Sequence, residues 1–142
     1  MIKVKVINNS NNPLPEYQTS GSAGCDVYSN EDIDIAPGNT TIIGTGLYMS
    51  IPKGFEIQVR PRSGMSLKTK MRVSNSLGAI DSDYRGEVGI IVDNIGNHTI
   101  SISKGDRIAQ FVIQEVLQIE WEPTLFLDST DRDQGGLGST GK

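Results

Sequence analysis

Residues branched at the β-carbon occur in short runs along the whole chain, and most runs are followed by a turn signal. The sequence contains 17 isoleucines, 9 valines and 9 threonines, against 4 alanines and 8 leucines. Branched side chains pack well on a pleated sheet but lose rotamer freedom on a helix. Glycine is also frequent, at 16 of 142 residues, as a fold with many turns requires. The pattern predicts an all-β fold.

The runs recur at roughly ten residues, a spacing typical of a sandwich, barrel or jelly roll. Turn signals such as Pro-Gly-Asn at 37–39 and Lys-Gly-Asp at 104–106 separate them. Only residues 63–70 are predicted to form a short helix. The predicted strands cover residues 1–7, 25–28, 32–36, 40–50, 55–60, 71–75, 87–93, 98–103 and 107–120.

The end of the chain differs in composition from the rest. Residues 128–142 contain four glycines and one large apolar residue, Leu137. Such a segment cannot build a core of its own and is expected to be mobile when nothing covers it. Because we find neither a repeat nor a linker, we interpret the chain as one domain, with a core over residues 1–127 and a flexible tail over 128–142.

Charge and composition exclude several classes of protein. Lys and Arg total 13 and Asp and Glu 17, so the formal net charge is −4, whereas nucleic-acid and anionic-membrane binders normally carry a basic face. One cysteine and one histidine exclude a disulfide framework and a Cys/His zinc site, so a metal would need oxygen ligands. The sequence shows neither an apolar run of the roughly 18 residues that span a membrane nor a signal-peptide core. We expect a cytoplasmic protein with no nucleic-acid or membrane partner.

Three polar, glycine-rich segments interrupt the strands, at residues 21–28, 60–68 and 75–87. The second contains Arg62 followed by Ser-Gly, which could start a short helix. A guanidinium, a hydroxyl and free backbone amides are the groups that bind a phosphate chain. This segment therefore indicates a phosphate-binding site.

The third segment is predicted to form two strands that reverse near residues 81–83. Asp81 follows two apolar residues, a context that can hold a carboxylate close to a substrate. Arg85 and Glu87 could instead pair with each other across a strand or contact another subunit. We interpret Cys25 as a small core residue, because no base is placed to activate it.

In order along the chain, these segments resemble the five motifs of the trimeric dUTP pyrophosphatase (dUTPase) family. The resemblance runs from about residue 15 to the C-terminus and lies in Gly-Cys-Asp at 24–26, Pro-Arg-Ser-Gly at 61–64, GAIDSDYRG at 78–86, KGDRIAQ at 104–110, and residues 132–141. It implies a β-clip, jelly-roll-like fold and a homotrimer whose active sites are shared between chains. It also implies that dUTP is hydrolysed to dUMP and pyrophosphate, which limits uracil incorporation into DNA and supplies dUMP for dTTP synthesis.

The same resemblance implies a role for each matching residue. Asp81 would be the general base that activates a water for attack on the α-phosphorus, and Tyr84 would pack on the deoxyribose and exclude a 2′-hydroxyl. Mg²⁺ would be bound mainly by triphosphate oxygens, with Asp26 in its outer shell through water. The residues implied in substrate binding are Arg62, Ser63, Gly64, Asn75, Gly78, Ala79, Ile80, Tyr84, Gln110, Arg132, Leu137, Gly138, Ser139 and Thr140.

One departure and two alternatives accompany this interpretation. Many family members have Phe where this chain has Leu137, so we predict a weaker cover over the uracil. A dCTP deaminase shares the fold but needs a glutamate in the strand after the third motif, where this sequence has Ile91. A trimeric regulator could use the same surface to bind a protein partner, although an intact Asp81 argues against a purely non-catalytic role.

Overall fold

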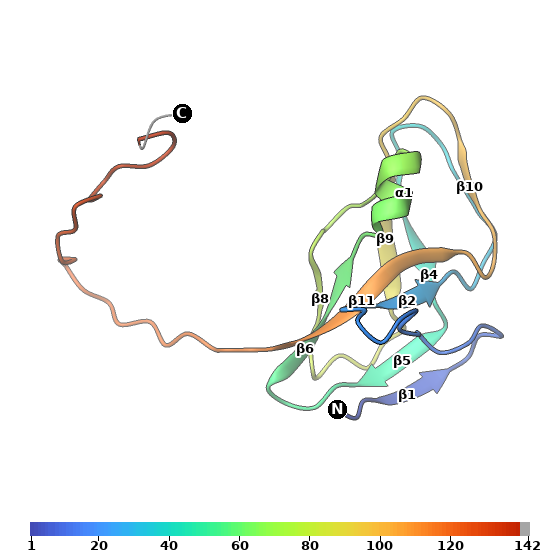
Figure 1. Ribbon diagram of the computed structural model, residues 1–142, viewed down its shortest axis with the longest axis horizontal. Coiled ribbons are helices and arrows are strands. Elements are labelled where there is room, and N and C mark those ends of the chain that lie inside the picture. Colours follow the sequence, from blue (N-terminus) through green and yellow to red (C-terminus); the bar gives the residue numbers. More distant parts are fainter. Residues whose placement is uncertain (140–142) are drawn as a thin grey trace.

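The computed structural model describes residues 1–139 and confirms the all-β prediction (Figure 1). Within this range no helix is long and apolar enough to cross a membrane. The described part contains eleven strands and one short helix: β1 Lys5–Asn8, β2 Cys25–Tyr28, β3 Ile33–Ile35, β4 Thr40–Gly44, β5 Leu47–Ser50, β6 Phe55–Arg60, α1 Ser63–Lys68, β7 Met71–Val73, β8 Gly78–Ile80, β9 Gly89–Asn94, β10 Ile100–Ile102 and β11 Arg107–Glu115.

The strands form small antiparallel sheets that join distant parts of the chain. The largest has the order β2-β11-β6-β8, and a three-stranded sheet has the order β4-β9-β7. Two strand pairs, β1 with β5 and β10 with β3, complete the described fold. β11 lies between β2 and β6, so the last strand is paired with the second and the sixth. This is the non-sequential pairing of a jelly-roll-like architecture.

The core lies where the inward faces of both larger sheets meet. Along β9, intermediate and buried residues alternate, which places Ile90 and Val92 in the core and fully buries them. Ile43 of β4 and Val27 of β2 are also fully buried in the same apolar cluster. Since side chains of a strand point alternately to its two faces, the period-two pattern of the sequence decides which residues form this core.

Two parts of the predicted strand pattern differ from the structure. The run over 40–50 is divided into β4 and β5 by a bend at Thr45 and Gly46, where Gly46 has a φ of +71°. The predicted hairpin near 81–83 was wrong. β8 pairs with β6, whereas β9 pairs with β4 and β7, so the chain crosses from one sheet to the other between them. Each of these strands reaches its partner through a pairing that local sequence does not reveal.

The predicted strand over 107–120 also ends early, because β11 stops at Glu115. After the Val116 amide donates to the carbonyl of Gly54, the chain runs away from the core as an extended segment (Figure 1). We call residues 116–139 the arm. Its large apolar side chains are exposed; they are Val116, Leu117, Ile119, Trp121, Leu125, Phe126, Leu127 and Leu137. The arm therefore carries apolar surface that its own core does not cover.

Candidate functional site

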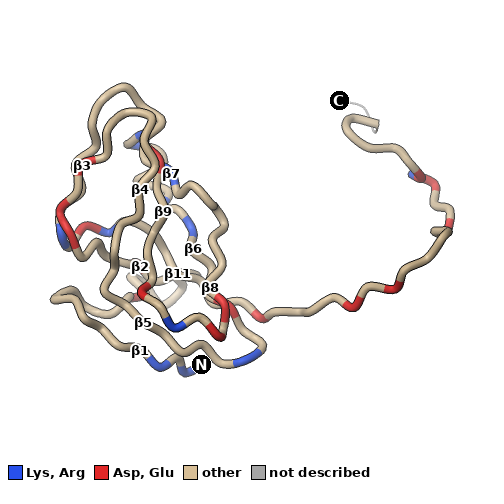
Figure 2. The backbone as a smooth tube through the Cα atoms, turned by 180° about the vertical axis from the view of Figure 1, so that it is seen from behind, with Lys and Arg blue, Asp and Glu red and all other residues tan. Residues whose placement is uncertain are grey.

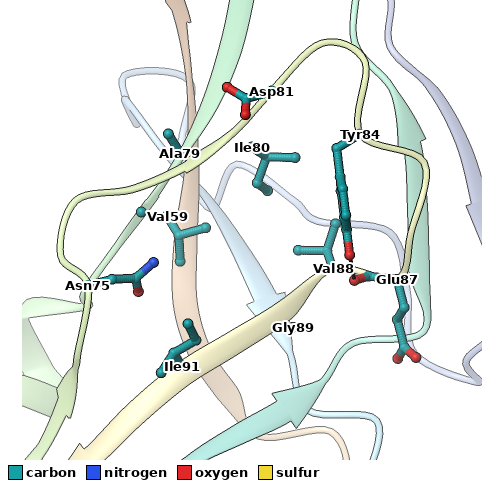
Figure 3. Close-up of a pocket in the computed structure, with 11 residues that line it drawn as sticks. Val59, Asn75, Ala79, Ile80, Asp81, Tyr84, Glu87, Val88, Gly89 and Ile91 are labelled. Atoms are coloured by element: carbon teal, nitrogen blue, oxygen red, sulfur yellow. Dashed lines mark hydrogen bonds between the residues drawn. The ribbon is translucent and has the colours of Figure 1, made fainter.

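A cavity of about 190 Å³ opens beside β8 and β9 (Figure 3). It contains six of the predicted site residues: Asn75, Gly78, Ala79, Ile80, Asp81 and Tyr84. Val59 of β6 and Ile91 of β9 contribute apolar lining, and Glu87, Val88 and Gly89 complete it. Glu87, Val88 and Gly89 directly follow the predicted motif in the sequence but were given no place in the site; the crossing from β8 to β9 brings them to the cavity.

β8 supplies backbone groups to this cavity. Among the described strands it is the last of its sheet and pairs only on its β6 side, with Ala79 opposite Gln58. The outer edge of such a strand presents N–H and C=O groups that are free to bind a planar polar ligand. Asn75 adds a side-chain amide close to this edge, since a β-carbon at Gly78 would lie 3.2 Å from its Nδ2.

Asp81 follows β8 directly and is exposed at the rim of the cavity. A turn fixes its backbone, because the amide of Tyr84 donates to its carbonyl at 3.2 Å. Within residues 1–139 its carboxylate accepts no hydrogen bond from the protein. A carboxylate in this position can hold a water beside a ligand in the cavity.

Tyr84 forms another wall of the cavity and is 47% exposed. Its hydroxyl donates to the carbonyl of Glu87 at 2.9 Å (Figure 3). Arg85 does not pair with Glu87; its guanidinium donates to the carbonyls of Ser82 and Tyr84. Hydrogen bonds within the segment that follows Asp81 therefore hold its conformation.

A second polar cluster surrounds Asp26 on β2, which is only 2% exposed. One carboxylate oxygen accepts from Arg62 Nε at 3.0 Å and from Gln110 Nε2 at 3.3 Å. The other accepts from Arg107 Nη1 at 3.1 Å. Two guanidiniums on one buried carboxylate leave a net positive charge at the surface, which suits an anionic ligand.

Arg107 was not among the predicted site residues, although it lies in the fourth motif. In a regular strand, Arg107 and Gln110 would point to opposite faces, because they are three residues apart. The register of β11 against β2 shifts between Arg107 and Ala109. A one-residue irregularity of this kind turns both side chains toward Asp26. The bulge depends on the pairing with β2, so no local pattern would have revealed it.

Ser63 and Gly64 lie at the start of α1, directly after Arg62. Backbone amides in the first turn of a helix have no partner within the helix. A β-carbon added at Gly64 would meet nothing within 4 Å, so the backbone here is open to a ligand. Arg62 joins this stretch to the Asp26 cluster, because it bonds to Asp26 and directly precedes Ser63.

The remaining predicted site residues lie on the arm. Arg132, Leu137, Gly138 and Ser139 are exposed, and Arg132 Nε donates to the carbonyl of Gly135 within the arm. Thr140 lies outside the described residues. Among residues 1–139, the lining of the cavity includes neither the Asp26 cluster nor the arm. A single chain therefore presents the predicted site as three separate parts.

Cys25 agrees with its interpretation as a core residue. It packs against the apolar cluster, and its thiol donates to the carbonyl of Phe111 at 3.5 Å. Burial raises the pKa of the Cys25 thiol, which keeps it protonated and unreactive at neutral pH.

An edge strand facing a cavity, a carboxylate at the end of that strand and a separate guanidinium cluster are typical of an all-β protein that binds a nucleotide. The strand edge suits a base, and the guanidiniums suit phosphates.

Comparisons with known proteins narrow this class: the chain belongs to the dUTPase family, whose sequence model matches residues 2–141. It is 52% identical over 142 residues to the deoxyuridine 5′-triphosphate nucleotidohydrolase of Finegoldia magna, covering 99% of both chains.

Solved structures show the same fold. The dUTPase of Staphylococcus bacteriophage 80alpha with dUPNHPP superposes with a TM-score of 0.91 at 27% identity, covering 99% of both chains. A mutant dUTPase from phage phi11 of S. aureus, whose structure reveals the coordination of a structural Mg(II) ion, has a TM-score of 0.82 at 26% identity and covers 89% of this chain and 99% of that one.

Proposed function

We propose that this protein hydrolyses dUTP to dUMP and pyrophosphate. The family and its relatives named deoxyuridine 5′-triphosphate nucleotidohydrolase support this activity over nearly the whole chain. The observation that carries the proposal is the cavity itself, which joins a free strand edge to the carboxylate of Asp81.

In this proposal, uracil binds along the edge of β8 and to the amide of Asn75. Backbone groups there can pair with the uracil edge, and we expect the residues around the base to exclude the methyl group of thymine. Cytosine would place a donor against a donor and leave buried groups unpaired, a mismatch that can cost roughly 10⁴-fold or more. Tyr84 packs against the deoxyribose and excludes a 2′-hydroxyl.

Asp81 is the proposed general base. Its carboxylate orients a water and takes its proton as the water attacks the α-phosphorus. Pyrophosphate is the leaving group, and its charge is met by Arg62, the amides of Ser63 and Gly64, and Gln110. The arm residues Arg132, Gly138, Ser139 and Thr140 close over the outer phosphates, and Leu137 covers the base.

We propose a homotrimer with shared sites, because one chain presents the cavity, the Asp26 cluster and the arm apart. A groove of about 210 Å³ offers a place for the arm of another copy; it is lined by apolar residues that include Ile2, Val4, Val6, Leu14 and Tyr17. The arm is apolar and carries several acidic residues (Figure 2), whereas Lys3 and Lys5 alternate in the sequence with Ile2, Val4 and Val6, which line the groove. The arm and the groove are therefore complementary in both apolar surface and charge.

We also propose that Mg²⁺ accompanies the substrate. Among residues 1–139 no three His, Cys, Asp or Glu side chains come together, so a cage of protein ligands is not formed. Mg²⁺ commonly retains water and binds substrate phosphates with one or two carboxylates. Asp26 fits an outer-shell role only if one of its guanidiniums moves away, and Arg107, with a side chain 43% exposed, has solvent to move into.

The test of the reaction is pyrophosphate release from dUTP with Mg²⁺, beside dCTP, dTTP and UTP, for the wild type and Asp81→Asn. Activity confined to dUTP and reduced at least 10²-fold in the variant supports the proposal. Release from none of them would refute it, and ammonia release from dCTP would identify a deaminase instead.

Site sharing can be tested by complementation. Asp81→Asn and Arg62→Ala chains are each expected to be inactive, but co-expressed chains should form some sites with an intact Asp81 from one chain and an intact Arg62 from another. Activity in the mixture supports shared sites. A mixture as inactive as its parts would show that each site belongs to one chain.

A further inference from the structure

The ring of Tyr84 is held in one place by its own segment. Its hydroxyl donates to the carbonyl of Glu87, three residues later, at 2.9 Å. The ring lies directly over Gly86: a β-carbon there would fall on the Tyr84 hydroxyl and within 2.7 Å of Cζ. A side chain at 86 would therefore push the Tyr84 ring out of this position.

The carbonyl that receives the hydroxyl is itself anchored to the bend between β4 and β5. Glu87 Oε1 accepts from the amide of Gly46 at 2.9 Å. The next residue, Val88, is fixed by both of its backbone groups. Its carbonyl accepts from Thr45 Oγ1 at 2.6 Å, and its amide donates to the carbonyl of Leu47 at 2.8 Å. A continuous series of hydrogen bonds therefore runs from the bend to the wall of the cavity.

We propose that Glu87 is a positioning residue that sets the place of the Tyr84 ring and so tightens the rejection of ribonucleotides. Its carboxylate anchors its own backbone to Gly46, and its backbone carbonyl holds the Tyr84 hydroxyl. Losing either bond lets the ring move outward and makes room for a 2′-hydroxyl. The inference rests on the proposed dUTP hydrolysis and on the place of Tyr84 beside the sugar.

The measurement is the ratio of kcat/KM for dUTP to kcat/KM for UTP. A purely structural role lowers both values equally, because a smaller folded fraction cancels in the ratio. Glu87→Ala and Tyr84→Phe are each expected to lower the ratio roughly three- to tenfold, as the loss of one hydrogen bond allows. Glu87→Gln keeps an oxygen acceptor and should restore the wild-type ratio.

Glu31 provides a matched control. Its Oε1 accepts from the amide of Gly44 at 2.7 Å, on the other side of the same bend, but within residues 1–139 it makes no hydrogen bond to Tyr84 or Glu87. Glu31→Ala should leave the ratio unchanged. In the double variant Glu87→Ala/Tyr84→Phe the ratio should fall no further than in either single variant, because both changes release the same ring.

An unchanged ratio in Glu87→Ala, or effects that multiply in the double variant, would overturn the proposal. If Glu87→Ala does not fold, Tyr84→Phe decides: an unchanged ratio shows that the hydroxyl anchor has no role in rejection. A wild type that releases no pyrophosphate from dUTP, or that prefers UTP, would refute the proposed function itself. The wild-type activity is therefore measured before that of any variant.

Discussion

Replacing Asp26 by Asn tests the buried charge cluster most directly. The residue is 2% exposed, and its two carboxylate oxygens accept from three donors. Asn offers one oxygen and one NH₂ group, whereas each oxygen of Asp26 accepts from a guanidinium. In either orientation of the Asn amide, its NH₂ group therefore faces the N–H groups of one arginine. The less costly orientation directs the NH₂ group at Arg107, whose more exposed side chain can move into water.

The cost can be worked out from these contacts. The contact with Arg107 is half in solvent, so its loss costs about 1 kcal/mol instead of the full value of a buried pair. A buried NH₂ group without an acceptor adds about 1–3 kcal/mol. We expect Asp26→Asn to lower the free energy of unfolding by about 2–4 kcal/mol.

Urea unfolding followed by far-UV circular dichroism measures this, at one fixed protein concentration because the proposed assembly would add to stability. Asp83→Asn makes the same change at an exposed site and should leave the unfolding midpoint unchanged. In an Arg107→Ala background the Asp26→Asn change should cost less, since the opposing donor is gone. Equal costs in both backgrounds, or a midpoint like that of the wild type, would refute the reasoning.

Three further outcomes are expected. Ile90→Ala removes a fully buried side chain from the core and should lower the free energy of unfolding by about 2–5 kcal/mol in the same urea assay. Deleting residues 128–142 should leave the circular dichroism and melting temperature of the core unchanged but lower kcat/KM for dUTP, because the described part of that segment is exposed and makes no contribution to the core. Leu137→Phe should lower KM for dUTP several-fold, since an aromatic ring over a base adds about 0.5–1.5 kcal/mol; an unchanged KM and kcat would show that this position does not cover the base.

The strands that carry alternating branched residues could be predicted from the sequence. The strand expected over 55–60 is observed as β6, and the one expected over 87–93 is observed, shifted by one or two residues, as β9. The strand before Asp81 was predicted only as one half of a hairpin, and its pairing with β6 was not, because Gly-Ala-Ile is too short to show a period and two of its residues favour strands weakly. Its structure comes from pairing with β6, a tertiary effect.

The site was predicted in part for a similar reason. The motif that contains Asp81 and Tyr84 could be recognised because its residues are contiguous and polar. Arg107 could not, because its direction depends on a bulge, and Glu87 could not, because its partner Gly46 lies 41 residues away at a bend. The roles assigned to the site residues stay predictions.

The arm also determines what tryptophan fluorescence measures in this protein. The chain has a single tryptophan, Trp121, which lies on the arm and is 81% exposed. Its emission therefore follows the surroundings of the arm and is blind to the packing of the β core. An arm in water emits at long wavelength, and an arm seated on another subunit emits at shorter wavelength. In the proposed trimer, fluorescence and circular dichroism, recorded on one sample during dilution or denaturation, follow two different events: release of the arm and melting of the sheets.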